Sequence, residues 1–253
     1  MQSQTLKKII IPTVLLLCAR ASVADTSASV SCSGNGSASA YSRSGSGVSH
    51  SSVRCTNSSG QDSVVPGGIA TSKSYSPGLY TSLVMSGAGN VEIRTGSENS
   101  VIVSGGGNYV ESVEVNSSGG VLAIHWPDTG NSNLNVTVTG SALQTLEISG
   151  AGNTEVYGDF PHGLSVRKSG AGNINIGGQA SYLVLNLSGA GNTVARNLIT
   201  NEVEVDASGA GNVSVCAKES VSGSLSGAVH FNIYCNPPRE SIHTQGASSI
   251  RYR

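Results

Sequence analysis

The string Ser-Gly-Ala-Gly-Asn recurs along the chain, and its spacing limits the fold more than any other feature. From the copy at 149–153 onward, successive copies begin 18 to 20 residues apart. Intact copies span 86–90, 149–153, 169–173, 188–192 and 208–212, and degenerate copies span 104–108, 226–230 and 245–249. A repeat of this length is too short for two helices, and glycine at this frequency destabilises a helix. The repeat is therefore expected to consist of strands and turns.

Apolar and polar residues alternate on both sides of each copy. Before Ser188, for example, Leu183, Leu185 and Leu187 are separated by Val184 and Asn186, and most other copies follow the same pattern. A second short alternating segment follows each copy, as in 173–176. A period of two is typical of a strand with one face buried and one face in solvent. Each unit of about 19 residues therefore reads as strand, corner, strand and loop.

A single unit of this size cannot bury its apolar face, but stacked units can. The sequence therefore predicts an all-β fold, a right-handed parallel β-helix (solenoid) with coils of about 19 residues over 78–253. Residues 91–140 depart from the simple period and read as a first, longer-looped part of the same domain. Residues 25–77 are rich in Ser and Gly and are interpreted as an N-terminal segment or spacer.

The corner residues of the repeat are expected to have a shared structural role. Glycine there would allow positive φ or close approach of two backbones. Asparagine would either form a hydrogen-bonded ladder from coil to coil or serve as a turn residue, and both explanations fit. The predicted corner residues are Gly150, Gly152, Asn153, Gly170, Gly172, Asn173, Gly189, Gly191, Asn192, Gly209, Gly211 and Asn212.

The N-terminus has the pattern of a signal peptide. Lys7 and Lys8 precede the apolar run 9–18, and the small residues of 22–24 form a cleavage site. Residues 1–24 are therefore predicted to be removed. A lipidated Cys18 is the weaker alternative because Leu17 stands where a small residue is needed. No later segment approaches the roughly 18 apolar residues of a spanning helix. The sequence predicts an exported protein that is periplasmic, at the cell surface or secreted, without a transmembrane segment.

The cysteine count and the low content of charged residues indicate which kind of exported protein this is. Removal of 1–24 leaves Cys32, Cys55, Cys216 and Cys235, and an even number in an exported chain indicates disulfides. The local pairings Cys32–Cys55 and Cys216–Cys235 are preferred, and the second pair is separated by one repeat. Free buried thiols are the alternative. Charged residues make up only 11% of the chain and form no basic cluster, so nucleic-acid binding is not expected.

The chain resembles a known family, the "head GIN domain" of auto-transporter adhesins found in many bacterial exported proteins. The resemblance rests on the repeated Ser-Gly-Ala-Gly-Asn copies, the strands at 91–96, 101–104 and 120–124, and the C-terminal runs 233–237 and 245–250. It covers roughly residues 78–253. It implies a β-helical domain at or outside the cell envelope, and it supplies no catalytic residues.

Several functions are compatible with these features. The leading hypothesis is a non-catalytic adhesin or binding module for a polysaccharide or a cell-surface protein, without a cofactor or metal. A structural envelope protein without a dedicated ligand is the first alternative. The second is a polysaccharide lyase or glycosidase, for which the best carboxylate cluster is Glu202, Glu204 and Asp206. A solvated outer face is the more ordinary explanation of that cluster.

Four smaller expectations follow from individual residues. Glu147 and Arg167 occupy the same position in successive repeats and are predicted to form a surface ion pair. Trp126 is expected to cap the core rather than to stack on a sugar. The motif serines lack the Gly-x-Ser-x-Gly elbow and an evident His partner, so turn chemistry is expected for them. Calcium binding is not expected because Asn stands where the repeat-toxin motif has Asp.

Overall fold

The computed structural model describes residues 37–45, 48–56, 62–63, 70–126 and 134–253. The predicted signal peptide at 1–24 and Cys32 lie outside the described residues. Over the described ranges the fold is all-β apart from one short helix, α1 (Gly107–Glu111), as the sequence predicts. The strands of the repeat region are β10 (Thr145–Phe160), β11 (Leu164–Ala180), β12 (Tyr182–Ala190), β13 (Thr193–Tyr234), β14 (Arg239–Thr244) and β15 (Ser249–Tyr252).

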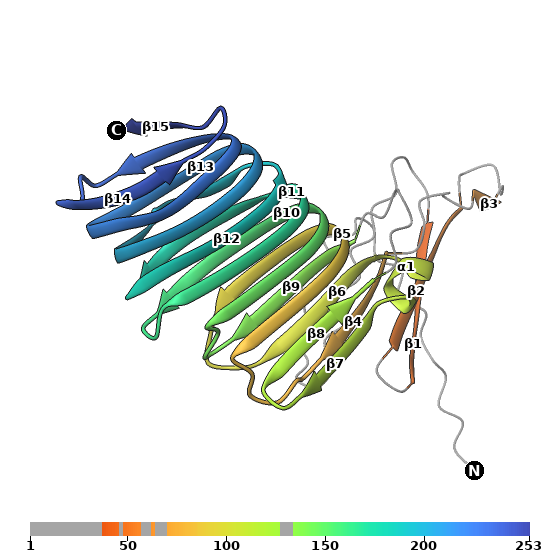
Figure 1. The fold of residues 1–253 in the computed structure, drawn as a ribbon. Coiled ribbons are helices and arrows are strands. Elements are labelled where there is room, and N and C mark those ends of the chain that lie inside the picture. Colours follow the sequence, from red (N-terminus) through yellow and green to blue (C-terminus); the bar gives the residue numbers. More distant parts are fainter. Residues whose placement is uncertain (1–36, 46–47, 57–61, 64–69, 127–133) are drawn as a thin grey trace, which may run out of the picture.

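Successive repeats stack in parallel and in register (Figure 1). We call each strand, corner and following strand a coil. β10 pairs with β11 over its whole length, from Thr145 opposite Ser165 to Phe160 opposite Ala180. β11 pairs in parallel with β12 and β13, and β13 pairs in parallel with β14 and β15. Because equivalent positions of the repeat copies lie opposite each other, the residues at one position of the repeat form a row of side chains across the coils.

The first intact copy of the motif stacks directly on the second, although a long segment separates them in the sequence. β5 (Ser82–Thr95) pairs in parallel with β10, so that Gly87 lies opposite Gly150 and Asn90 opposite Asn153. On its other side, β5 pairs in parallel with β8 (Val121–His125) and β9 (Asn135–Gly140). β8 and β9, which follow β5 in the sequence, therefore lie on the side of β5 away from β10, rather than between the two coils.

The N-terminal part differs from the parallel arrangement expected throughout 78–253. β6 (Ser100–Gly106) pairs antiparallel with β9, and β7 (Glu114–Ser118) pairs antiparallel with β8. The sheet is therefore mixed. Gly119 and Gly120 explain the β7–β8 pairing, because they have φ of 59° and 79° and form a two-residue connection. Such a connection joins neighbouring antiparallel strands, whereas parallel neighbours need a long crossover.

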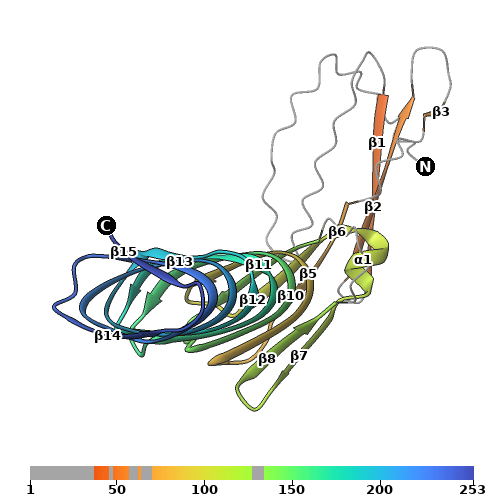
Figure 2. The same ribbon diagram turned by 45° about the horizontal axis from the view of Figure 1, so that its top comes forward.

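Strands also occur in the Ser/Gly-rich segment before residue 78. β1 (Ser37–Gly45) and β2 (Val48–Thr56) pair antiparallel, and β2 pairs antiparallel with β3 (Asp62–Ser63) and β4 (Ala70–Tyr75). β4 pairs antiparallel with β6 and so joins the sheet. The view in Figure 2 shows β1 and β2 extending away from the coils.

The degenerate copy at 104–108 is not a corner of the stack, contrary to its place in the alignment. Its first residues end β6, and its last two residues begin α1. The helix places Val110 in the core, where it is fully buried, and Tyr109 packs against the same core. This copy therefore ends a strand and begins a helix, whereas the intact copies are followed by a second strand.

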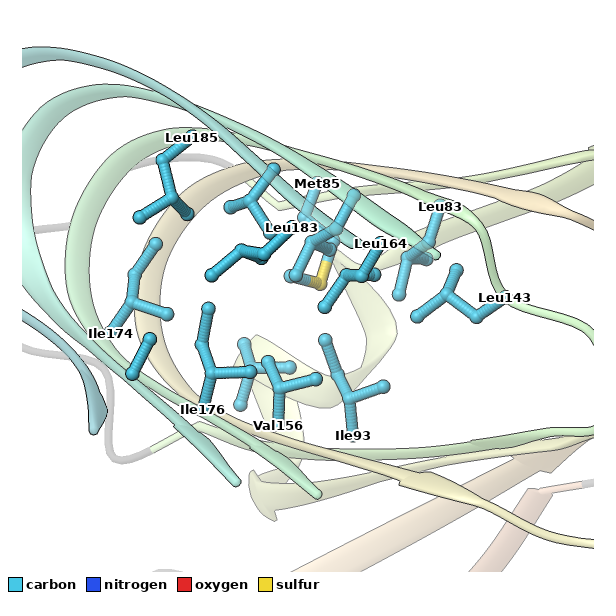
Figure 3. Packing of buried hydrophobic residues seen from close by; sticks show 14 of the residues in the cluster. Leu83, Met85, Ile93, Leu143, Val156, Leu164, Ile174, Ile176, Leu183 and Leu185 are labelled. Carbon is cyan, nitrogen blue, oxygen red and sulfur yellow. The ribbon is translucent and has the colours of Figure 1, made fainter. Parts of the chain in front are cut away.

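The core is a narrow column of aliphatic side chains that runs through the centre of the coils. Figure 3 shows Leu164, Leu183 and Leu185 facing Val156 and Ile176 across the interior. These residues occupy the inward columns predicted from the alternation, and all five are buried. The opposite faces of the same strands remain in solvent, and they carry the candidate site.

Candidate functional site

The corner glycines allow the coils to approach each other closely. A Cβ added to Gly170 would lie 2.4 Å from the carbonyl oxygen of Gly150, and Gly170 has a φ of 104°. Both features exclude a side chain at this position. Six further predicted corner glycines also have positive φ, namely Gly150, Gly152, Gly189, Gly191, Gly209 and Gly211. Gly172 is not among the positive-φ residues, but a Cβ there would meet the carbonyl oxygen of Gly152 at 2.3 Å.

The motif asparagines form a ladder on the surface of the corner. The Asn173 Nδ2 donates to Asn153 Oδ1 at 3.0 Å, and the Asn192 Nδ2 donates to Asn173 Oδ1 at 3.0 Å. The ladder continues at 2.7 Å from Asn212 to Asn192 and at 3.5 Å from Asn153 to Asn90. The side-chain amide is used as donor and acceptor in turn, so these residues are occupied with one another.

Several motif serines are also occupied, by the backbone of the neighbouring coil. The hydroxyls of Ser149, Ser188 and Ser208 donate to carbonyl oxygens at 3.3–3.4 Å. The side chains of the corner therefore stabilise the stack, and they leave few hydrogen-bonding groups for a ligand.

Lys168 is a residue that the sequence pattern did not single out for a role. It stands in a column that is otherwise aliphatic or Ala, and only 7% of its surface is exposed. Its Nζ donates to the carbonyl oxygen of Ala190 at 2.8 Å. Burial lowers the pKa of the Lys168 ammonium, because removal from water disfavours the charged form.

A groove of about 490 Å³ crosses the outward face of β10 to β13. Its first row consists of outward residues in register, with Glu147 opposite Arg167, Arg167 opposite Asn186, and Asn186 opposite Asp206. Ser224 extends the row, since its hydroxyl donates to Asp206 Oδ1 at 2.7 Å. We call these five residues the groove row. The remaining lining residues are Ile148, Lys168, Leu187, Ala207, Ser169, Ser188, Ser208 and Ser226.

Much of the groove row has no partner within the part of the chain that the structure describes. Glu147 and Arg167 are exposed, Asn186 is half-buried, and none of the three makes a side-chain hydrogen bond or ion pair there. The predicted Glu147–Arg167 ion pair is therefore wrong, although the two residues are register partners. Exposed charges gain little from pairing across water, so their side chains remain directed into solvent.

The carboxylates considered for polysaccharide hydrolysis are distributed along the outward face of β13. Glu202, Glu204 and Asp206 are all exposed. Glu202 lies 3.9 Å from Arg239 Nη2, which also pairs with Glu219 at 3.4 Å. Asp206 accepts the bond from Ser224. Only Asp206 lines the groove, and the three residues do not enclose a common cleft.

One motif serine does have a histidine partner, contrary to the expectation for the motif. The Ser86 hydroxyl lies 2.6 Å from His125 Nδ1, and the two residues are register partners on β5 and β8. Glu114 is the register partner of His125 on β7, but it makes no hydrogen bond with the histidine among the described residues. At the other end of the stack, His230 Nδ1 lies 2.7 Å from Ser249 Oγ. Alignment of the motif alone could not find the first pair, because it depends on how β8 packs against β5.

Trp126 is buried, as predicted from the sequence. It is 2% exposed, and its indole N–H donates to the carbonyl oxygen of Ala88 at 2.8 Å. The ring lies where a Cβ of Gly87 would be, so the glycine makes room for it. Trp126 therefore caps the core at the first corner and is not available to stack on a ligand.

One of the two predicted cysteine pairings lies within the described residues. Cys216 and Cys235 form a disulfide between neighbouring coils, as predicted, with their Cα atoms 5.2 Å apart. Cys55 lies on β2, and its predicted partner Cys32 lies outside the described residues.

Within the described ranges, no group of His, Cys, Asp and Glu side chains could hold a metal ion. No helix in those ranges has the length and apolarity needed to cross a membrane.

Comparison with solved structures supports the fold. A "putative adhesin" from Bacteroides fragilis NCTC 9343 matches with a TM-score of 0.58 and 18% sequence identity, covering 74% of this chain and 99% of that chain. A "putative adhesin" from Parabacteroides distasonis ATCC 8503 matches with a TM-score of 0.40 and 16% identity, covering 74% and 98%. The first match shows a shared fold, and the second is too distant to add to it. No curated protein matches the chain.

The family comparison confirms the resemblance seen in the sequence. The model described as "Putative auto-transporter adhesin, head GIN domain" matches residues 79–237. This range contains the five intact copies of the motif and the complete groove row. The chain therefore belongs to the head GIN domain family of auto-transporter adhesins.

Proposed function

We propose that this protein is an exported, non-catalytic binding module that attaches to molecules on a cell surface. The observation that carries the proposal is the groove row, in which polar side chains repeat from coil to coil and three of them, Glu147, Arg167 and Asn186, have no side-chain partner among the described residues. A repeat protein presents such a row as an extended surface suited to a repeated or elongated ligand. Membership of an adhesin family supports the same function.

The proposal includes the finer features expected from the sequence. Residues 1–24 would act as a signal peptide, 25–77 as an N-terminal segment or spacer, and 78–253 as the GIN-like domain. The protein would then lie in the periplasm, on the cell surface or in the medium. The coils from β5 onward would wind as a right-handed parallel β-helix. Their in-register parallel pairing supports this, and crossovers between parallel strands are right-handed in nearly all known sheets.

A binding assay on whole cells and on a glycan array tests this function. Purified protein covering 25–253 is labelled and titrated onto sibling bacterial cells, host cells and immobilised glycans. We expect saturable binding to at least one of these surfaces, and we expect it to persist in a variant that lacks 25–69. Absence of binding to every surface would favour the alternative of a structural envelope protein without a dedicated ligand.

A second candidate function rests on the Ser86–His125 pair. A serine hydroxyl within hydrogen-bond distance of an imidazole is the first requirement of a serine hydrolase. The arrangement lacks the third group that orients the base, because Glu114 does not contact His125 among the described residues. Binding therefore remains the preferred function.

A further inference from the structure

The five residues of the groove row follow one another along the stack of coils at a nearly constant interval. Neighbouring strands lie about 4.8 Å apart, so the row from Glu147 to Ser224 spans roughly 19 Å. The residues belong to successive coils rather than to one loop, and each coil offers a single polar side chain to the row. A ligand that uses all of them must itself be extended and must offer a polar group at each step.

The chemistry of the row matches hydroxyl groups. Glu147 and Asp206 carry acceptor oxygens, Arg167 carries only donors, and Asn186 carries both. A hydroxyl donates and accepts, so it can pair with every one of these side chains. Beside the row, Ile148 is half-buried and can contact the C–H groups of a sugar ring, whereas Leu187 and Ala207 line the groove but are buried in the core.

The charges of the row argue against a charged polymer. The two carboxylates at Glu147 and Asp206 lie on either side of Arg167, and Asn186 is neutral. The buried Lys168 also lines the groove, so the lining holds two carboxylates and two cations and its formal charges balance. A polyanion would place negative groups beside both carboxylates, and a polycation would place a positive group beside Arg167. Like charges brought together in this way oppose binding. An uncharged chain avoids both conflicts.

We propose that the groove across β10 to β13 binds a linear, uncharged polysaccharide that lies along the axis of the coils. Glu147, Arg167 and Asn186 hydrogen-bond to hydroxyls on successive units of the chain, and Asp206 and Ser224 contact its end. This proposal rests on the binding function stated above and names the class of ligand that the groove takes.

Affinity measurements with defined polymers test the proposal. Affinity gel electrophoresis and calorimetric titration are performed with neutral dextran, laminarin, mannan and hydroxyethyl cellulose, with anionic polygalacturonate, and with cationic chitosan. We expect saturable binding to at least one neutral polymer and weaker binding to both charged polymers. For the neutral polymer that binds, affinity should rise with oligosaccharide length until the chain spans the groove, since each added unit reaches a further residue of the groove row.

Variants locate the binding to the groove row. Arg167→Ala and Glu147→Ala should each weaken binding of the neutral polymer roughly tenfold or more, because each removes a charged hydrogen-bonding partner. Arg196→Ala and Glu155→Ala are matched controls, since both residues are exposed and neither lines the groove. The controls should bind like the wild type. All four variants should retain the cooperative unfolding of the wild type.

Two results would overturn the proposal. The first is the absence of binding to every neutral polymer, and the second is neutral-polymer binding that the Arg167→Ala and Glu147→Ala variants retain in full. If cells or glycan arrays bind the protein while the neutral polymers do not, the ligand class is wrong and the binding function stands. If neither cells, arrays nor polymers bind, both proposals fail.

Discussion

Gly170 lies directly over Gly150 of the neighbouring coil, with the Gly150 carbonyl oxygen 2.4 Å from where a Cβ of residue 170 would be. Replacement of Gly170 by Ala therefore requires the two coils to separate. It also places a side chain on a residue with a φ of 104°. We expect Gly170→Ala to lower the free energy of unfolding by about 2–4 kcal/mol. Urea denaturation followed by the fluorescence of Trp126, the only tryptophan, measures this loss.

Gly78 provides the matched control for this substitution. No atom lies within 4 Å of a Cβ added there. Gly78→Ala should change the free energy of unfolding by no more than about 0.5 kcal/mol. Equal losses in the two variants would contradict the role assigned to the corner glycines.

Lys168 makes stability depend on pH in a defined direction. Its pKa is lower in the folded protein than the ordinary value of 10.5, because burial disfavours the ammonium. Between these two pKa values the unfolded chain holds more protons than the folded protein, so the free energy of unfolding rises with pH. We expect this rise in the wild type and its absence in Lys168→Leu, as measured by urea denaturation from pH 7 to 10.5.

The same variant should also be more stable at pH 7. The equivalent position of the next coil is Leu187, so a leucine suits the column. Replacement of a buried charge by an aliphatic side chain should add about 1 kcal/mol. Lys218→Leu, at an exposed position, serves as the control and should keep the pH dependence of the wild type. A loss of stability in Lys168→Leu at pH 7 would show that the bond to Ala190 outweighs the burial of the charge.

The disulfide between Cys216 and Cys235 should stabilise the C-terminal coils. It closes a segment with a sequence separation of 19 residues, for which the entropy of the unfolded chain predicts about 3 kcal/mol. Replacement of both cysteines by serine should lower the free energy of unfolding by this amount. Addition of reductant should then have no further effect on these coils. Peptide mapping without reduction identifies the linked pair directly, and a 216-containing peptide without its partner would contradict the pairing.

Ser86 separates the binding function from the hydrolase alternative. An activated serine reacts covalently with a fluorophosphonate probe, whereas a serine that only hydrogen-bonds to a neighbour does not. We expect no labelling of the protein at neutral pH, and we expect Ser86→Ala to behave like the wild type in the cell-binding assay. Labelling that disappears in both Ser86→Ala and His125→Ala would establish a reactive pair and favour the hydrolase.

Much of the repeat region could be predicted from the sequence because its signal is local and repeated. The alternation around the leucines 183, 185 and 187 determines which side chains enter the core, and the spacing of the corner motif determines which residues stack. The disulfide followed from the same spacing. Outward columns were also correct, and they placed Glu147 beside Arg167.

The remainder could not be predicted because it depends on contacts between distant segments. The packing of β5 on β10 leaves β8 and β9 on the other side of β5, which brings His125 to Ser86. Antiparallel pairing of β7 with β8 is different, because the short Gly119-Gly120 turn is a local hairpin signal that the interpretation as parallel repeats passed over. The burial of Lys168 depends on a carbonyl at Ala190 that only the stacked coils bring within reach.

Binding of the protein to cells, compared between the wild type and a groove variant, tests the central claim most directly. The labelled wild type, the double variant Glu147→Ala/Arg167→Ala and the control double variant Glu155→Ala/Arg196→Ala are titrated onto the cells that bind best. We predict saturable binding by the wild type and the control, with the groove variant reduced at least tenfold. Equal binding by all three proteins would contradict the claim that the groove row is the surface through which this protein attaches.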